Sequence, residues 1–225
     1  MITPKQGPVF SRYVGLTVAA LVVLAMAFAF YVRAEKQVDR ANELRHQSFL
    51  LADELRQSSD DLTRMARTYM VTGEARYKQY YQAILDIRDG KQPRPLEYQS
   101  IYWDLVQANG TTPRPDSTQS VALLELLRQA GFTDQELNKL EEAKANSDGL
   151  THIEFEAMQQ IEKLAGTAAD ANRAKALRMM HDDRYHQAKA AIMKPINEFY
   201  QLMDVRTAEA VRSASRQALM VRSAF

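Results

Sequence analysis

The feature that most limits what this chain can fold into is an uncharged apolar segment near its N-terminus. Residues 13–32 form a run of 20 residues without a charged side chain, bounded by Arg12 and Arg33. At a rise of ~1.5 Å per residue, a helix of this length covers the roughly 30 Å hydrocarbon core of a bilayer. Tyr13 and Tyr31 lie near its two ends, where amphipathic rings favour the interface. The segment predicts a transmembrane helix.

The alternative is a cleaved signal peptide, whose apolar core usually has ~7–15 residues. The run in this chain is longer, and we therefore predict an anchor, although small residues such as Ala25 and Ala27 keep the alternative open. Orientation does not follow from charge. Basic residues flank both ends of the run, and more of them follow it than precede it, which would place the large region inside the cell. Long domains translocate largely regardless of charge, so this count decides little.

Composition excludes several classes of protein. The 225 residues carry a formal net charge of +1, with basic residues spread along the chain, so there is no electrostatic case for nucleic-acid binding. Cysteine is absent, which removes disulfides, thiolate metal sites and cysteine nucleophiles together. Apolar residues make up 46% and only eight glycines occur, which is typical of a folded, helix-rich protein.

The pattern after the apolar run predicts helices throughout. From Lys36 to Thr72 there is no proline or glycine, and small or apolar residues recur in steps of three and four, as on the packed face of a long helix. Gly73 is expected to end this helix. Further helices are expected over residues 74–89, 98–106, 117–130, 134–164, 168–180 and from 183 onward, with Gly149 as a possible interruption. Thr133 and Glu136 form a capping box that predicts a helix start at Asp134. The expected fold is all-α: a transmembrane helix followed by an elongated antiparallel helical bundle.

Three short segments carry a family resemblance. They are Thr68 to Tyr77 with the following Tyr80-Tyr81, then Ile101 to Leu105, and Ala145 to Leu150. The first resembles the corner between the first two helices of bacterial extracytoplasmic four-helix sensors, found in chemoreceptors, sensor histidine kinases and membrane diguanylate cyclases. The overall plan is similar to that of helical bimodular sensors, although this chain is shorter than a typical member. The resemblance implies a protein anchored in the inner membrane of a bacterium, with its sensor domain in the periplasm. It also implies a homodimer and a cytoplasmic output module.

The same corner supplies the candidate ligand-binding residues, which are Arg64, Arg67, Arg76, Tyr77, Tyr80 and Tyr81. Arginine forks bind carboxylates bidentately, and tyrosines offer both apolar surface and a hydroxyl, so this set could frame a site for a small organic anion. The simpler interpretation is that the tyrosines belong to the core and the arginines pair with surface acids. Both interpretations stay open on the sequence alone.

Ordinary catalytic constellations are missing from the sequence. It contains no glycine-rich phosphate loop, no His-Glu-x-x-His and no G-x-S-x-G elbow. One cluster has a metal-like composition, His181, Asp182, Asp183 and His186, and acids at a helix start explain it without a metal. We therefore expect no enzymatic activity for this region, no cofactor and no metal. The acids Asp53, Glu54, Asp60, Asp61, Glu154 and Glu156 could suggest a di-metal carboxylate site. Such a site needs two inward Glu-x-x-His pairs, and we interpret these acids as solvated helix faces.

These observations predict the following organisation. Residues 1–12 are a cytoplasmic N-terminus, 13–32 a transmembrane helix, 33–222 a periplasmic sensor domain, and 223–225 the approach to a second transmembrane helix beyond this chain. The expected function is ligand-sensing input to a transmembrane receptor, with a small organic ligand or a periplasmic binding protein as partner. The alternative is a single-pass, membrane-anchored scaffold for periplasmic proteins. Ser48, Ser58 and Ser147 lie on apolar faces, where small polar residues predict only weak dimerisation.

Overall fold

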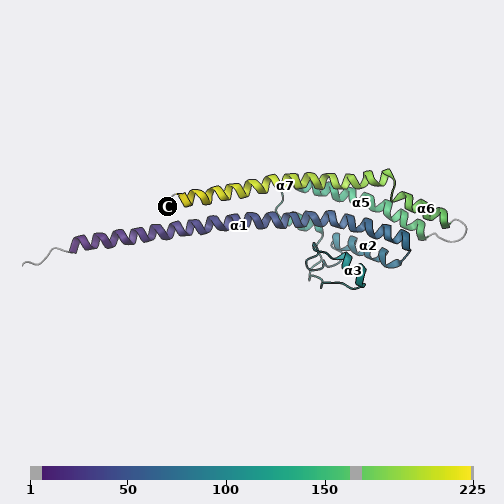
Figure 1. The fold of residues 1–225 in the computed structure, drawn as a ribbon, viewed down its shortest axis with the longest axis horizontal. Helices are drawn as coiled ribbons and strands as arrows, with labels where there is room; N and C mark the ends of the chain where they lie inside the picture. The colour runs from purple at the N-terminus through teal and green to yellow at the C-terminus, as the bar shows by residue number, and fades with distance from the viewer. Residues whose placement is uncertain (1–6, 163–168, 224–225) are drawn as a thin grey trace, which may run out of the picture. The chain divides into compact units, whose positions relative to one another are not determined.

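A computed structural model describes residues 7–162 and 169–223, and the fold class over these residues is all-α. The helices are α1 (Gly7–Thr72), α2 (Ala75–Arg88), α3 (Trp103–Asn109), α4 (Leu123–Gln129), α5 (Asp134–Glu162), α6 (Ala169–Met179) and α7 (Asp183–Ser223) (Figure 1). The described residues contain no β-strand, and an isolated bridge joins Pro95 and Asp116 in the connector between α2 and α4. The all-α prediction is confirmed.

Helix α1 contains the predicted membrane span and runs without a break to Thr72. It is long and apolar enough to cross a membrane, by length and composition, and among the described residues it is the one helix that meets this test. Its apolar side chains are exposed, for example Leu16 at 67% and Phe28 at 67%. An exposed apolar surface of this length is costly in water, so α1 is compatible with membrane anchoring.

The chain divides into two compact units. One contains residues 1–45 and 205–225, where α1 and α7 line a shallow groove of about 420 Å³ that includes Ala41, Leu44, Ala210 and Ala214. The other, His46–Asp204, contains most of the buried apolar side chains, and we call it the core unit. Its largest fully buried residues include Tyr81, Tyr185 and Phe199. The predicted packed face of α1 is buried here, with Leu55 at 2%, Leu62 at 1% and Met65 at 0% exposure.

Contacts within the core unit fix the directions of its long helices. Between α5 and α7, Lys139 pairs with Glu198 and Glu154 with Tyr185. A later residue of α5 contacts an earlier residue of α7, so the two helices are antiparallel. The same antiparallel relation holds for α1 with α2, for α2 with α5, and for α1 with α7. The supporting pairs are Glu54 with Arg94 just beyond α2, Arg88 with Ser147, Tyr81 with Glu154, Ser59 with Lys189, and Asp53 with Tyr200.

Local sequence signals explain the helix ends. Gly73 adopts a φ of +70° directly after α1, a left-handed conformation that favours glycine. At the start of α5, the Glu136 carboxylate accepts hydrogen bonds from the Thr133 backbone N–H at 2.8 Å and from its hydroxyl at 2.9 Å. The capping-box prediction is therefore confirmed. Gly149 does not interrupt α5, which is continuous from Asp134 to Glu162.

In the segment between α2 and α5, the helices formed differ from those predicted. The helix predicted over 98–106 occupies Trp103–Asn109, and the one predicted over 117–130 is limited to Leu123–Gln129. In place of helical turns, the connector forms long-range backbone hydrogen bonds. Leu96 N–H donates to the Pro115 carbonyl at 3.0 Å, and Ser117 N–H donates to the Arg94 carbonyl at 2.8 Å. These bonds join the chain segments on either side of the helix predicted over 98–106 and satisfy backbone groups there.

Candidate functional site

A buried carboxylate joins the helices of the core unit. Glu154 on α5 is 1% exposed, and its two oxygens accept hydrogen bonds from different helices. The Tyr185 hydroxyl of α7 lies 2.6 Å from Oε1, and the Tyr81 hydroxyl of α2 lies 2.7 Å from Oε2. The prediction that Glu154 lies on a solvated helix face is therefore wrong. Two phenol donors satisfy a carboxylate that would otherwise be buried at high cost.

The network continues from Glu154 towards α1. The Thr63 hydroxyl lies 2.9 Å from the Tyr185 hydroxyl and donates to the Ser59 carbonyl at 3.0 Å. The Lys189 ammonium donates to the Ser59 hydroxyl at 2.8 Å and to the Thr63 hydroxyl at 3.2 Å. Together, Glu154, Tyr81, Tyr185, Thr63, Ser59 and Lys189 form what we call the polar network. It links α1, α2, α5 and α7, so displacing one of these helices breaks a hydrogen bond within it.

Burial dominates the electrostatics of the polar network. Desolvation raises the pKa of Glu154, while hydrogen bonds from Tyr185 and Tyr81 lower it by less. Desolvation and the neighbouring Glu154 charge raise the pKa of both tyrosines, which keeps their hydroxyls protonated as donors. Burial also lowers the pKa of Lys189, against the opposing effect of Asp60, which lies 3.0 Å away. The network therefore holds its charged groups in an environment that favours their neutral forms.

Two further acids predicted as solvated are also buried. Glu54 is 5% exposed and lies 3.0 Å from the Arg94 guanidinium, and desolvation raises its pKa to about 7 although Arg94 lowers it. Asp61 is 7% exposed and pairs with Arg64 at 2.5 Å, and desolvation raises its pKa to about 6. Both acids lie on α1, and each has an arginine partner, as buried charges require.

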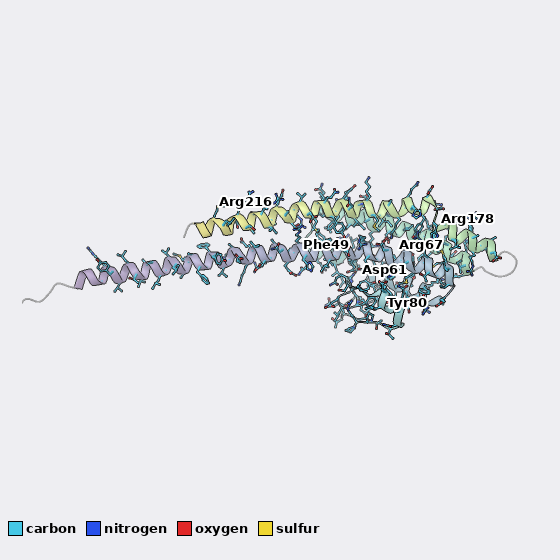
Figure 2. The ribbon with its side chains drawn as sticks, in the orientation of Figure 1. Phe49, Asp61, Arg67, Tyr80, Arg178 and Arg216 are labelled. Carbon is cyan, nitrogen blue, oxygen red and sulfur yellow. The ribbon has the colours of Figure 1, made fainter. Side chains whose placement is uncertain are left out.

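The predicted arginine and tyrosine set is divided among several places. Arg64 pairs with Asp61 and with Asp104 of α3. Arg67 donates to the Met180 carbonyl at 2.9 Å and lies over the Tyr185 ring at 5.2 Å, next to the polar network. Figure 2 shows Asp61 and Arg67 on α1 and Tyr80 on α2.

The remaining members divide between surface and core. Arg76 pairs with Glu74 at 2.7 Å and lies over the Tyr77 ring at 4.9 Å, at the exposed corner. Tyr80 packs between Tyr77 and Trp103, with ring centroids 6.2 Å and 5.6 Å away. Tyr81 points into the core towards Glu154. Tyr81 therefore belongs to the polar network and Arg67 borders it, whereas Arg76 and Tyr77 do neither. A ligand-binding role for the whole set stays a prediction.

Arg88 shows how a polar residue on a packed face is accommodated. Its side chain is 2% exposed, and it donates to the Ser147 hydroxyl at 2.8 Å and to Asp148 at 2.9 Å.

The spacing of residues in the sequence indicates that Glu154 lies on a packed helix face. Leu140, Ser147, Glu154 and Ile161 follow one another at intervals of seven, so Glu154 continues the packed face on which Ser147 lies.

The described residues contain no group of three or more histidine, cysteine or acidic side chains arranged to hold a metal. Comparison with models of protein families, with curated proteins and with solved structures finds no match to this chain.

Proposed function

We propose that the core unit is the extracytoplasmic input region of a bacterial transmembrane receptor, anchored in the inner membrane by residues 13–32. The observation that carries the proposal is that one unbroken helix, α1, contains both the apolar span and part of the polar network. A change that rearranges hydrogen bonds around Glu154 would act on Thr63 and Ser59, and therefore on the helix that leads to the membrane.

The proposed mechanism is a choice between two packings of α1, α2, α5 and α7. Packed helices shift by ~1–2 Å between discrete arrangements, and a ligand that binds one arrangement more tightly favours it. A buried network of partly interchangeable donors and acceptors suits this role because each arrangement must satisfy the same groups in a different way. Thr63, for example, lies within reach of Ser59, Tyr185 and Lys189 at once.

The topology is testable because the chain contains no cysteine. A Thr112→Cys variant places one thiol in the exposed connector, and a Lys5→Cys variant places one before the apolar run. In cells with a permeabilised outer membrane, a membrane-impermeant maleimide should label Thr112→Cys, and should label Lys5→Cys only after lysis. Labelling in the opposite order would place the core unit in the cytoplasm and contradict the proposal.

Signal transmission needs a second test, since a scaffold would have the same topology. In a receptor that joins this chain to an output module, Tyr185→Phe should change the basal activity of that module because it removes a donor to Glu154. Tyr77→Phe is the matched control, since that hydroxyl lies at the surface beside Arg76. Equal output from both variants and the parent would favour the scaffold.

A further inference from the structure

The connector between α2 and α4, together with Leu126 of α4, lines an open cavity that the proposed mechanism does not use. Its volume is about 320 Å³, at the lower end of the range typical of small-molecule sites. It is formed by residues 94–99 on one side and by 117–119, Val121 and Leu126 on the other. Leu96, Val121 and Leu126 make much of its lining apolar, and Arg94 supplies a permanent positive charge.

Two of the nitrogen donors of the Arg94 guanidinium lack a hydrogen-bond acceptor within the described residues. Its side chain is 14% exposed, and Nε lies 3.0 Å from Glu54 Oε1 in an ion pair. Neither Nε nor Nη2 makes a hydrogen bond within the described part of the chain, and both atoms are shielded from solvent. A buried N–H donor without an acceptor is costly, so it marks a place where an acceptor is needed. Glu54 lies on the Nε side of the guanidinium, and Arg94 is one of the residues that line the cavity.

The acid that lines the cavity, Glu97, is not the acceptor for Arg94. Glu97 also lines the cavity, but its side chain is 73% exposed and its nearest cation is Arg114, at 3.6 Å. The backbone of Glu97 has a φ of +51°, a left-handed conformation that costs roughly 1–2 kcal/mol for a residue with a Cβ. Arg114 donates to the Glu97 carbonyl at 3.0 Å and supports this conformation. The wall of the cavity is therefore held in a strained shape by a residue outside it.

We infer that this cavity binds a small carboxylate with an apolar body, whose carboxylate accepts from the Arg94 guanidinium and whose body packs between Leu96, Val121 and Leu126. Arginine matches carboxylate geometry with two parallel donors, and such charge-assisted bonds are stronger in a poorly solvated site. Glu54 on α1 contacts the same guanidinium, so a ligand in the cavity would change the Arg94–Glu54 contact and act on the helix that contains the apolar span. The inference rests on the proposed function in one respect: a sensor must bind a ligand.

The test is calorimetric titration of the full chain in detergent micelles with benzoate, hexanoate and 3-phenylpropionate, and with benzamide as the uncharged counterpart of benzoate. At least one carboxylate should bind saturably, and benzamide should bind at least tenfold more weakly. Arg94→Gln should weaken carboxylate binding tenfold or more, the effect of losing a charge-assisted contact. Arg128→Gln is the matched control, because Arg128 lies on the exposed side of α4, pairs with Glu141 and does not line the cavity, and it should stay within about threefold.

A second variant protects the test against misfolding. Val121→Phe adds bulk to the cavity wall and leaves Arg94 in place, and it should also reduce binding tenfold or more. Retained fluorescence of Trp103, which is 4% exposed in the core unit, shows that each variant is folded. Absence of binding by all three carboxylates to the parent chain, or equal binding by folded Arg94→Gln, would overturn the inference. Either result would leave the maleimide topology test unaffected, so failure of the site and failure of the receptor proposal are distinguishable.

Discussion

Removing the Tyr81 hydroxyl tests whether Glu154 organises the core unit. Tyr81 is 0% exposed, and its hydroxyl donates to Glu154 at 2.7 Å. Tyr81→Phe keeps the ring and its packing against Phe155, with centroids 5.1 Å apart, and removes one donor from a buried carboxylate. Leaving a buried acceptor without its donor costs about 1–3 kcal/mol, so we expect a loss of about 2 kcal/mol in the free energy of unfolding.

The assay uses the single tryptophan of the chain. Trp103 lies in the core unit, is 4% exposed and donates to the Tyr98 hydroxyl at 2.7 Å, so its fluorescence reports unfolding of this unit rather than of the apolar span. Urea titration of the full chain in detergent micelles gives the midpoint. With a denaturant slope of roughly 2 kcal/mol per molar, a loss of about 2 kcal/mol lowers the midpoint by ~1 M.

The control and the double variant sharpen the result. Tyr77→Phe removes a hydroxyl that contacts Arg76 at the surface, and it should change stability by less than about 0.5 kcal/mol. Tyr81→Phe combined with Tyr185→Phe should cost more than the sum of the single changes, because each single variant leaves Glu154 one phenol donor. A Tyr81→Phe midpoint equal to that of Tyr77→Phe would refute the assignment of Glu154 as the centre of the network.

Two other predictions concern pH and backbone. Burial raises the pKa of the Glu54 carboxyl from 4.5 to about 7, so the folded state binds a proton at Glu54 more tightly than the unfolded state does. Protonated Glu54 therefore stabilises the folded state fully below pH 4.5, and this stabilisation is lost as the pH rises through 7. The free energy of unfolding should therefore fall by about 2–3 kcal/mol less between pH 5 and pH 8 in Glu54→Gln than in the parent chain, as measured by urea titration at both pH values. An equal fall in both chains would contradict this prediction. Gly90→Ala should destabilise the chain by roughly 1–3 kcal/mol more than Gly73→Ala, as seen in urea midpoints. Both glycines have a φ near +70°, but a Cβ at Gly90 would lie 2.5 Å from the Ala122 nitrogen, whereas one at Gly73 meets nothing within 4 Å; equal midpoints would refute this close approach.

Features that depend on neighbouring residues were predictable from the sequence. The apolar run, the end of α1 at Gly73, the capping box at Thr133 and the packed face through Leu55 and Leu62 all follow from local spacing. Each depends on interactions within one or two helical turns, and such interactions have the same meaning wherever the helix is placed. The all-α fold class follows from these local signals together.

The connector and the acids required the tertiary structure. The segments over 98–106 and 117–130 have helical patterns, but the helices formed are Trp103–Asn109 and Leu123–Gln129. The chain beside them is joined by long-range contacts such as Leu96 to Pro115, which no local rule predicts. The same applies to the predicted arginine and tyrosine set. Neighbours in sequence such as Tyr80 and Tyr81 point to different surroundings, one towards Trp103 and the other towards Glu154.

The burial of Glu154 shows where sequence reasoning stops. Its spacing of seven from Ser147 places it on the packed face, but a carboxylate there is stable only if donors reach it from other helices. Those donors, Tyr81 and Tyr185, are separated from Glu154 by 73 and 31 residues along the chain. The sequence by itself therefore determined the all-α fold class, the end of α1 and the start of α5. Only the tertiary structure decided which charged groups are buried, because the free energy of a buried charge depends on partners that folding brings from distant parts of the chain.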